Sequence, residues 1–265
     1  MNFIRVFLAI IIVCVAFVCK AGNPTGDNAG TLLPEGEFVF NLPCKIVNIH
    51  PEKPGKALLF IWLHGGVKDR PKHNLFAFNH LDCCDADDMI IRYLQANGIK
   101  AIALLPVCHQ AVNEQCVTWS ECWNDVKRMI DDLVNHRLID PARIYLAGSS
   151  DGGTGTWDYV EQHPDVFAAA IAMSCNRPRM TSTPTFFFNT ADETDCSSQV
   201  AQLKRQGSNI LTYRHCADAK HGDDARQCTD DLLARFFAFS SAFRIFALFS
   251  AHEMTVFSVS RCLSK

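Results

Sequence analysis

Short runs of apolar residues recur along the chain, and each is bounded by residues that favour turns. Most are nearly continuous rather than alternating, which is typical of strands buried on both faces of a sheet. We therefore predict strands at residues 57–63, 100–107, 143–148, 168–174, 184–189 and 209–215.

Between these runs the apolar residues recur at spacings of three and four, which indicates amphipathic helices. The predicted helices cover residues 86–98, 123–138, 156–164, 197–207 and 230–239. Strands that alternate with helices predict an α/β fold, with a mostly parallel central sheet and helices on both faces. The 265 residues are enough for one large core.

The two ends of the chain do not continue this alternation of strands and helices. Arg5 precedes an apolar run from Val6 to Cys19, and Cys19 and Ala21 are the small residues that a signal peptidase accepts. We expect residues 1–21 to be a signal peptide and the protein to be secreted. An uncleaved membrane anchor is the alternative, but a run of about 14 residues is short for a span of ~20.

The tail over residues 239–265 is rich in Phe and Ser and has no assigned role. Its charged residues and polar end argue against a glycolipid-anchor signal. The predicted globular domain therefore covers residues 22–238, and no membrane contact is expected once the signal peptide is removed.

Charge and cysteine content indicate which partners, cellular compartment and cofactors to expect for this protein. The formal net charge of −3 becomes −5 once Arg5 and Lys20 are removed, so a nucleic-acid partner is not expected. Ten of the 13 cysteines lie between Cys44 and Cys228, which predicts up to five disulfides in an oxidising compartment. The adjacent Cys83 and Cys84 do not suit a single metal ion, and no metal or organic cofactor is expected.

The segment "GSSDG" at residues 148–152 fits the pattern G-x-S-x-G between a predicted strand and a predicted helix. A sharp turn of this kind needs glycine two positions to either side of the central residue, because the strand and helix backbones come close together. The pattern predicts that Ser150 is an exposed nucleophile.

A serine nucleophile needs a histidine base and an acid that orients it. Asp192 follows a predicted strand and is the expected acid, with Asp195 as the alternative. His221 lies in a polar loop and is the expected base, whereas His215 ends a strand and is expected to bond locally.

Backbone N–H groups should stabilise the oxyanion of such a reaction. Asp151 follows the nucleophile at a helix start, and Gly66 belongs to "HGG" after a strand, so their amides are the expected donors. His64 is expected to brace this loop. Trp119 and Trp123 either contact substrate or pack beneath the loops over residues 68–84 and 108–123, which should wall the cleft.

These segments together resemble the secreted α/β-hydrolase esterases of the polyhydroxybutyrate depolymerase and feruloyl esterase group, with their carboxylesterase relatives. The resemblance covers residues 58–237 and is most specific over "RIYLAGSSDGGTGTW" and "HPDVFAAAIA". It places the nucleophile on Ser150, the acid on Asp192, the base on His221 and the oxyanion donors on Gly66 and Asp151.

The chain also departs from the pattern of the group. Asn189 and Thr190 stand where His-Gly is usual, and Gly66 stands where depolymerases often have Cys. These departures weaken the assignment of a particular substrate more than they weaken the assignment of hydrolysis itself.

The resemblance implies a hydrolase of acyl, feruloyl or polyester-type esters. A connection of about ten residues after the strand at 168–174 leaves no room for a large lid, so an open cleft suited to polymeric esters is expected. A peptidase of the same fold and a non-catalytic binding protein are the alternatives. Oligomeric state has no signal in the sequence.

Overall fold

The computed structural model describes residues 36–39, 42–66, 86–108, 118–221 and 223–240. The predicted signal peptide, the loop over residues 68–84 and the tail beyond residue 240 lie outside the described residues. So do most of the residues of the second predicted cleft wall, between positions 109 and 117.

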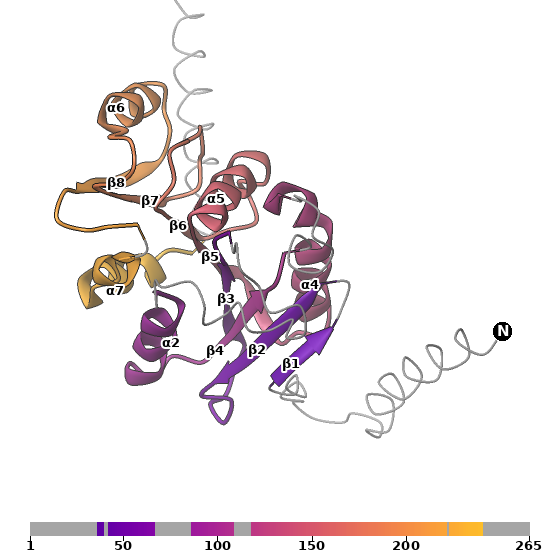
Figure 1. Ribbon diagram of the computed structural model, residues 1–265. Coiled ribbons are helices and arrows are strands. Elements are labelled where there is room, and N and C mark those ends of the chain that lie inside the picture. Colours follow the sequence, from indigo (N-terminus) through magenta and orange to yellow (C-terminus); the bar gives the residue numbers. More distant parts are fainter. Residues whose placement is uncertain (1–35, 40–41, 67–85, 109–117, 222, 241–265) are drawn as a thin grey trace, which may run out of the picture. The chain divides into compact units, whose positions relative to one another are not determined.

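The described residues form one eight-stranded sheet in the order β1-β2-β4-β3-β5-β6-β7-β8 (Figure 1). The antiparallel pairs β1–β2 and β2–β4 form one edge, and the other neighbouring strands run parallel. The strands are β1 (Gly36–Val39), β2 (Pro43–Ile49), β3 (Ala57–Leu63), β4 (Ala101–Pro106), β5 (Ile139–Ser149), β6 (Ala169–Met173), β7 (Thr185–Thr190) and β8 (Ile210–Cys216). All six predicted strands are present, and β1 and β2 are additional.

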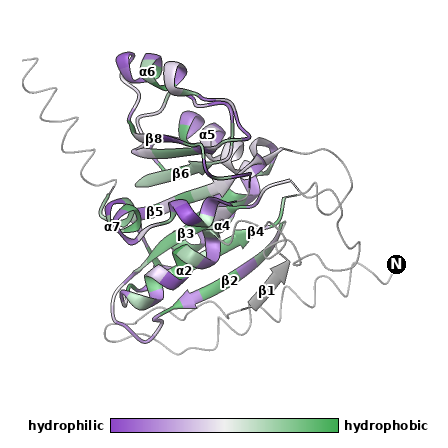
Figure 2. Ribbon diagram, turned by 60° about the vertical axis from the view of Figure 1, so that its left-hand side comes forward, coloured by the Kyte–Doolittle hydropathy of each residue, from purple (hydrophilic) through white to green (hydrophobic). Residues whose placement is uncertain are grey.

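Strands β3, β4, β6 and β7 are buried along their whole length because helices cover both faces of the sheet. Strand β3 is mostly hydrophobic (Figure 2), and every one of its residues is buried. Successive side chains of β3 belong to different apolar clusters. Leu59 and Ile61 join one cluster, whereas Leu58 and Phe60 join the other. This arrangement explains the unbroken apolar runs in the sequence.

Each of the five predicted helices is present. Apolar residues of α4 (Trp123–Asn135), α5 (Asp151–Gln162) and α6 (Ser197–Arg205) pack in the first cluster. Apolar residues of α2 (Ala86–Ala96) and α7 (Asp230–Phe237) pack in the second. The prediction of a mostly parallel sheet with helices on both faces is confirmed.

The register of the parallel strands aligns their carboxyl ends. Ser149 lies opposite Met173, and Met173 lies opposite Phe188. The segments that follow β5, β6 and β7 therefore leave the same edge of the sheet, which is where open α/β sheets bind ligands. The connection from β6 to β7 contains no helix, so no lid is inserted there.

No disulfide joins five of the described cysteines, so the predicted bridges are not observed at those positions. Cys44, Cys175, Cys196, Cys216 and Cys228 are thiols, and all except Cys216 are buried. Burial in the apolar interior raises the pKa of the Cys44 thiol to about 12, so Cys44 behaves as a small apolar residue. The Sγ atoms of two further cysteines, Cys108 and Cys122, lie 3.4 Å apart.

Candidate active site

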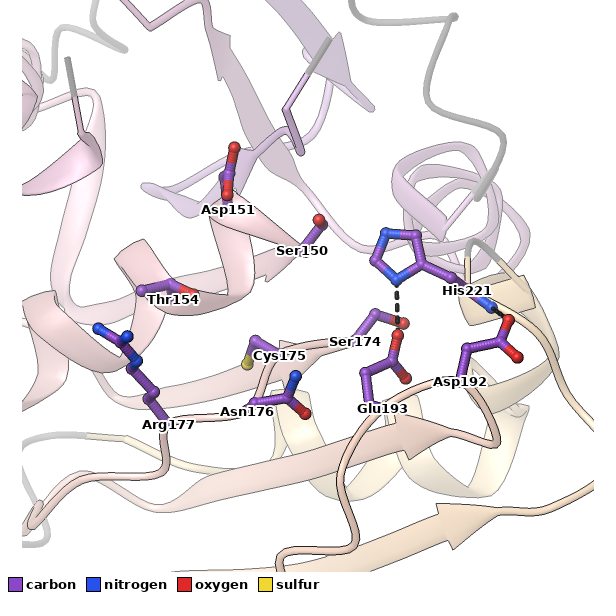
Figure 3. A pocket seen from close by; sticks show the side chains of 10 residues that line it. All are labelled: Ser150, Asp151, Thr154, Ser174, Cys175, Asn176, Arg177, Asp192, Glu193 and His221. Carbon is purple, nitrogen blue, oxygen red and sulfur yellow. Dashed lines mark hydrogen bonds and ion pairs between the residues drawn. The ribbon is translucent and has the colours of Figure 1, made fainter. Parts of the chain in front are cut away.

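Ser150 lies in a strained turn between β5 and α5. Its φ of 55° and ψ of −116° are rare for a residue with a side chain. The Ser150 N–H donates to the carbonyl of Met173 at 3.0 Å, and the Ser150 carbonyl accepts the helical bond from Thr154 at 3.0 Å. These bonds hold the turn so that the Ser150 side chain lines a pocket at the carboxyl end of the sheet (Figure 3).

The two flanking glycines allow this turn to form. A Cβ atom at Gly152 would overlap the carbonyl oxygen of Leu63 at the end of β3, and a Cβ at Gly148 would overlap the carbonyl oxygen of Gly152. The strand and helix backbones approach too closely for any larger residue. The steric reason given for the G-x-S-x-G pattern is therefore confirmed.

Gly66 and Asp151, the two expected oxyanion donors, lie next to each other. A Cβ atom at Gly66 would overlap a carboxylate oxygen of Asp151, so the loop after β3 closes against the first residue of α5. The N-terminal end of this helix carries the positive end of the helix dipole. The structure thus brings together the two backbone segments that could stabilise an oxyanion beside Ser150.

His64 braces this loop. Its Nε2 accepts a hydrogen bond from the Cys108 N–H at 3.1 Å, so its Nδ1 carries the proton and donates to the Gly65 carbonyl at 2.6 Å. The Trp119 indole N–H donates to the His64 carbonyl at 2.9 Å. His64 is only 2% exposed, so it belongs to the support of the site, as expected from its position in the chain.

Of the two predicted roles for the tryptophans, packing is the one observed. Trp119 is buried against α5, with its ring edge-on to His64 at 5.0 Å between centroids. Trp123 stacks on His163, with the ring centroids 3.9 Å apart and the planes 8° from parallel. Neither tryptophan lines the pocket.

The His221 ring meets Glu193 rather than the predicted acid, Asp192. Glu193 Oε1 lies 2.6 Å from His221 Nδ1, and the Glu193 side chain is 5% exposed. Glu193 Oε2 accepts the Thr190 N–H at 2.5 Å and also the Thr190 hydroxyl. A buried carboxylate with these partners fixes the ring, so that Nδ1 donates to Glu193 and Nε2 remains the acceptor.

Asp192 and Asp195 have other partners. Asp192 is exposed and accepts a hydrogen bond from the His221 backbone N–H at 3.1 Å, so it holds the loop rather than the ring. Asp195 accepts bonds from the N–H and hydroxyl of Ser197 at the start of α6, and these bonds lower the pKa of its carboxyl. The expectation that Asp192 orients the imidazole is therefore corrected: the turn after β7 directs Glu193 to the ring.

His215 bonds locally, as predicted from its place at the end of a strand. Its Nε2 lies 2.9 Å from the Thr190 carbonyl at the end of β7. The ring is thus engaged by the neighbouring strand, whereas His221 lines the pocket with Ser150.

A second buried carboxylate, Asp224, lies next to the site, and no feature of the sequence predicted it. Asp224 is 0% exposed and accepts hydrogen bonds from the hydroxyls of Ser149 and Ser174, the latter at 2.6 Å. Burial raises the pKa of its carboxyl, and the two serine bonds partly oppose that rise. Because Asp224 follows His221 by three residues, it ties the base-bearing segment to the ends of β5 and β6.

The pocket has a volume of about 540 Å³. Figure 3 shows Ser150 between the His221 ring at one end and Arg177 at the other. The described residues include no group of three or more potential metal ligands, and no described helix is long and apolar enough to cross a membrane. The lining residues are Ser150, Asp151, Thr154, Ser174, Cys175, Asn176, Arg177, Asp192, Glu193 and His221.

Comparison with sequence families matches residues 110–188 to the prolyl oligopeptidase family, Peptidase S9. The match contains Ser150 but ends before Glu193 and His221. No curated protein matches the sequence significantly.

Solved structures that resemble this chain share the α/β-hydrolase fold. A thermostable esterase is 20% identical with a TM-score of 0.62 over 77% of this chain, and this chain spans 62% of its length. A ferulic acid esterase is 18% identical with a TM-score of 0.55, covering 74% of this chain and 93% of its own. An acylaminoacyl peptidase is 14% identical with a TM-score of 0.55, covering 75% of this chain and 39% of its own.

Together, the parallel sheet, the turn at Ser150 and these neighbours show that the described domain has the α/β-hydrolase fold.

Proposed function

We propose that this protein is a secreted serine hydrolase that cleaves carboxylic esters, with Ser150 as nucleophile, His221 as base and Glu193 as the acid that orients His221. The carrying observation is the bond between His221 Nδ1 and buried Glu193 at 2.6 Å, in a pocket that Ser150 also lines. A carboxylate on one nitrogen of an imidazole leaves the other nitrogen as a proton acceptor, which is what a serine nucleophile requires.

In the proposed reaction, His221 Nε2 takes the Ser150 proton as Oγ attacks the ester carbonyl. The backbone N–H groups of Gly66 and Asp151 stabilise the resulting oxyanion. The imidazolium then gives its proton to the departing alcohol oxygen as the carbon–oxygen bond breaks, leaving an acyl group on Ser150. A water molecule, deprotonated by His221, attacks this acyl group, and the acid is released as Ser150 regains its proton.

Esters are favoured over peptides as substrates because two of the three structural neighbours described above are esterases. The match to the prolyl oligopeptidase family supports a peptidase as the second candidate. Comparing aminoacyl p-nitroanilides with p-nitrophenyl butyrate separates the two candidates: an esterase should hydrolyse the butyrate alone.

Ser150→Ala tests the nucleophile. The variant should fold normally, lose hydrolysis of p-nitrophenyl butyrate and lose covalent labelling by a fluorophosphonate probe. Ser197→Ala is a matched control, because Ser197 is an exposed serine at the start of α6 and does not line the pocket. Retention of most activity and labelling in Ser150→Ala would refute the assignment and favour a non-catalytic binding protein.

A further inference from the structure

Arg177 lines the pocket and has no role in the proposed chemistry. It lies in the segment that leaves β6, is exposed, and has no hydrogen bond or ion pair with any residue that the structure describes. Arg179, two positions later, contrasts with it. The Arg179 guanidinium pairs with Asp158 at 2.9 Å and Glu161 at 3.5 Å on α5, so its charge is already neutralised.

The backbone on the N-terminal side of Arg177 is fixed in place. The Cys175 N–H donates to the Asn189 side-chain oxygen at 3.2 Å, which joins this segment to β7. The Asn176 side-chain oxygen accepts the Thr194 N–H at 2.9 Å, which joins it to the turn that carries Glu193. With Arg179 held by α5 on the other side, Arg177 lines one end of the pocket from an anchored segment (Figure 3).

The charges around the pocket leave Arg177 as the available cation. The acidic lining residues are Asp151 beside Gly66, and Asp192 and Glu193, which are bonded to His221. Figure 3 shows these two His221 partners at the opposite end of the pocket from Arg177. A negative group on a substrate would therefore meet attraction at the Arg177 end and repulsion at the His221 end.

The proposed mechanism decides which part of an ester reaches Arg177. His221 must give its proton to the departing alcohol, so the alcohol part of the ester has to lie on the His221 side of Ser150. The acyl part then extends to the other side, where Figure 3 shows Arg177 and Thr154. Arg177 thus faces the acyl part of a bound ester.

We propose that Arg177 selects esters whose acyl part carries a free carboxylate, such as monoesters of dicarboxylic acids. The guanidinium can bind such a carboxylate through two parallel N–H donors. This inference rests on the esterase function proposed above, because it assumes that Ser150 and His221 define the acyl and alcohol sides.

Two methyl esters of the same shape test this role. Methyl hydrogen adipate carries a carboxylate at the far end of its acyl chain at pH 7, and methyl adipamate carries a neutral amide there. The wild-type kcat/KM should be up to about fivefold higher for the charged ester, a modest factor because Arg177 is exposed. Arg177→Gln should remove this preference by lowering kcat/KM for the charged ester alone, and 0.5 M salt should weaken the wild-type preference.

Arg205→Gln is the matched control, because Arg205 is exposed in the last turn of α6 and does not line the pocket; it should keep the wild-type preference. Equal kcat/KM for the two methyl esters in the wild type would overturn the role of Arg177, and so would an unchanged preference in Arg177→Gln. If p-nitrophenyl butyrate is still hydrolysed in these experiments, the proposed esterase function stands. Absence of p-nitrophenyl butyrate hydrolysis would overturn the proposed function, and this inference with it.

Discussion

The sharpest test of the site distinguishes Glu193 from Asp192, two adjacent acids that both contact His221. Glu193→Gln keeps the size of the side chain but replaces the acceptor at His221 Nδ1 with an amide. The amide N–H group would face the ring and favour the tautomer with its proton on Nε2, which cannot accept a proton from Ser150. In serine hydrolases this type of change lowers kcat about 10³- to 10⁴-fold, or about 4–5.5 kcal/mol of activation free energy.

Asp192→Asn is the matched control. Asp192 is exposed and accepts one bond at 3.1 Å from the His221 backbone N–H, which the oxygen of an asparagine can still accept. The substitution should replace a charged acceptor with a neutral one and keep the hydrogen bond, so we expect kcat to fall by about five-fold or less. Asp195→Asn should change kcat less than twofold, because Asp195 bonds to Ser197 and Tyr213 instead.

The assay is kcat and KM for p-nitrophenyl butyrate in the wild type and the three variants, with urea unfolding to confirm that each is folded. In Glu193→Gln the amide oxygen can still accept the bonds from Thr190, so this variant should remain folded. A larger loss of kcat in Asp192→Asn than in Glu193→Gln would refute the assignment and restore the acid that the sequence predicted.

Two further predictions concern buried carboxyls. Asp224→Ala should leave the hydroxyls of Ser149 and Ser174 unpaired in the interior. The free energy of unfolding of this variant in urea should therefore be about 2–4 kcal/mol lower than that of the wild type. A difference below about 0.5 kcal/mol would show that these bonds do not stabilise the fold. Burial raises the pKa of Asp87 from 3.8 to about 6, so the folded protein holds this proton more tightly than the unfolded chain does. Stability from this group is present below pH 3.8 and is lost as the pH rises through about 6. Relative to Asp87→Asn, the wild type should therefore lose about 3 kcal/mol over that interval, and parallel stability curves for the two proteins would contradict the shift.

The parts of the fold that were predicted from sequence are those with a strong local signal. The run "ALLFIWL" is buried at every position in β3, so its apolar character is unbroken. Strand β2 was missed because Lys45 and Asn48 interrupt its apolar residues and some of its side chains are only partly buried. The strand forms through antiparallel pairing with β4, a contact between distant segments that no local pattern records.

The acid at His221 was wrongly predicted for a similar reason. The segment "TADETD" offers three carboxyls within four positions, and spacing alone does not decide which of them reaches the ring. The Glu193 N–H bonds to the Thr190 carbonyl at 3.1 Å and closes a tight turn after β7. This turn brings the Glu193 side chain back over the end of the strand, while Asp192 lies at its exposed tip. A buried position beside a strand end is the signal that identifies Glu193, and it exists only in three dimensions.

Contacts between segments that are far apart in the chain also hold the strained turn at Ser150. Holding Ser150 at a φ of 55° costs about 1–3 kcal/mol, so other contacts must keep it there. They are the bond from the Ser150 N–H to Met173 and the two serine hydroxyls on Asp224, which lies 75 positions after Ser149 in the chain. The glycines of the pentapeptide around Ser150 thus make the turn sterically possible. Its rigidity comes from β6 and from the segment that carries His221, so any change that loosens Asp224 should disturb the serine and the histidine together.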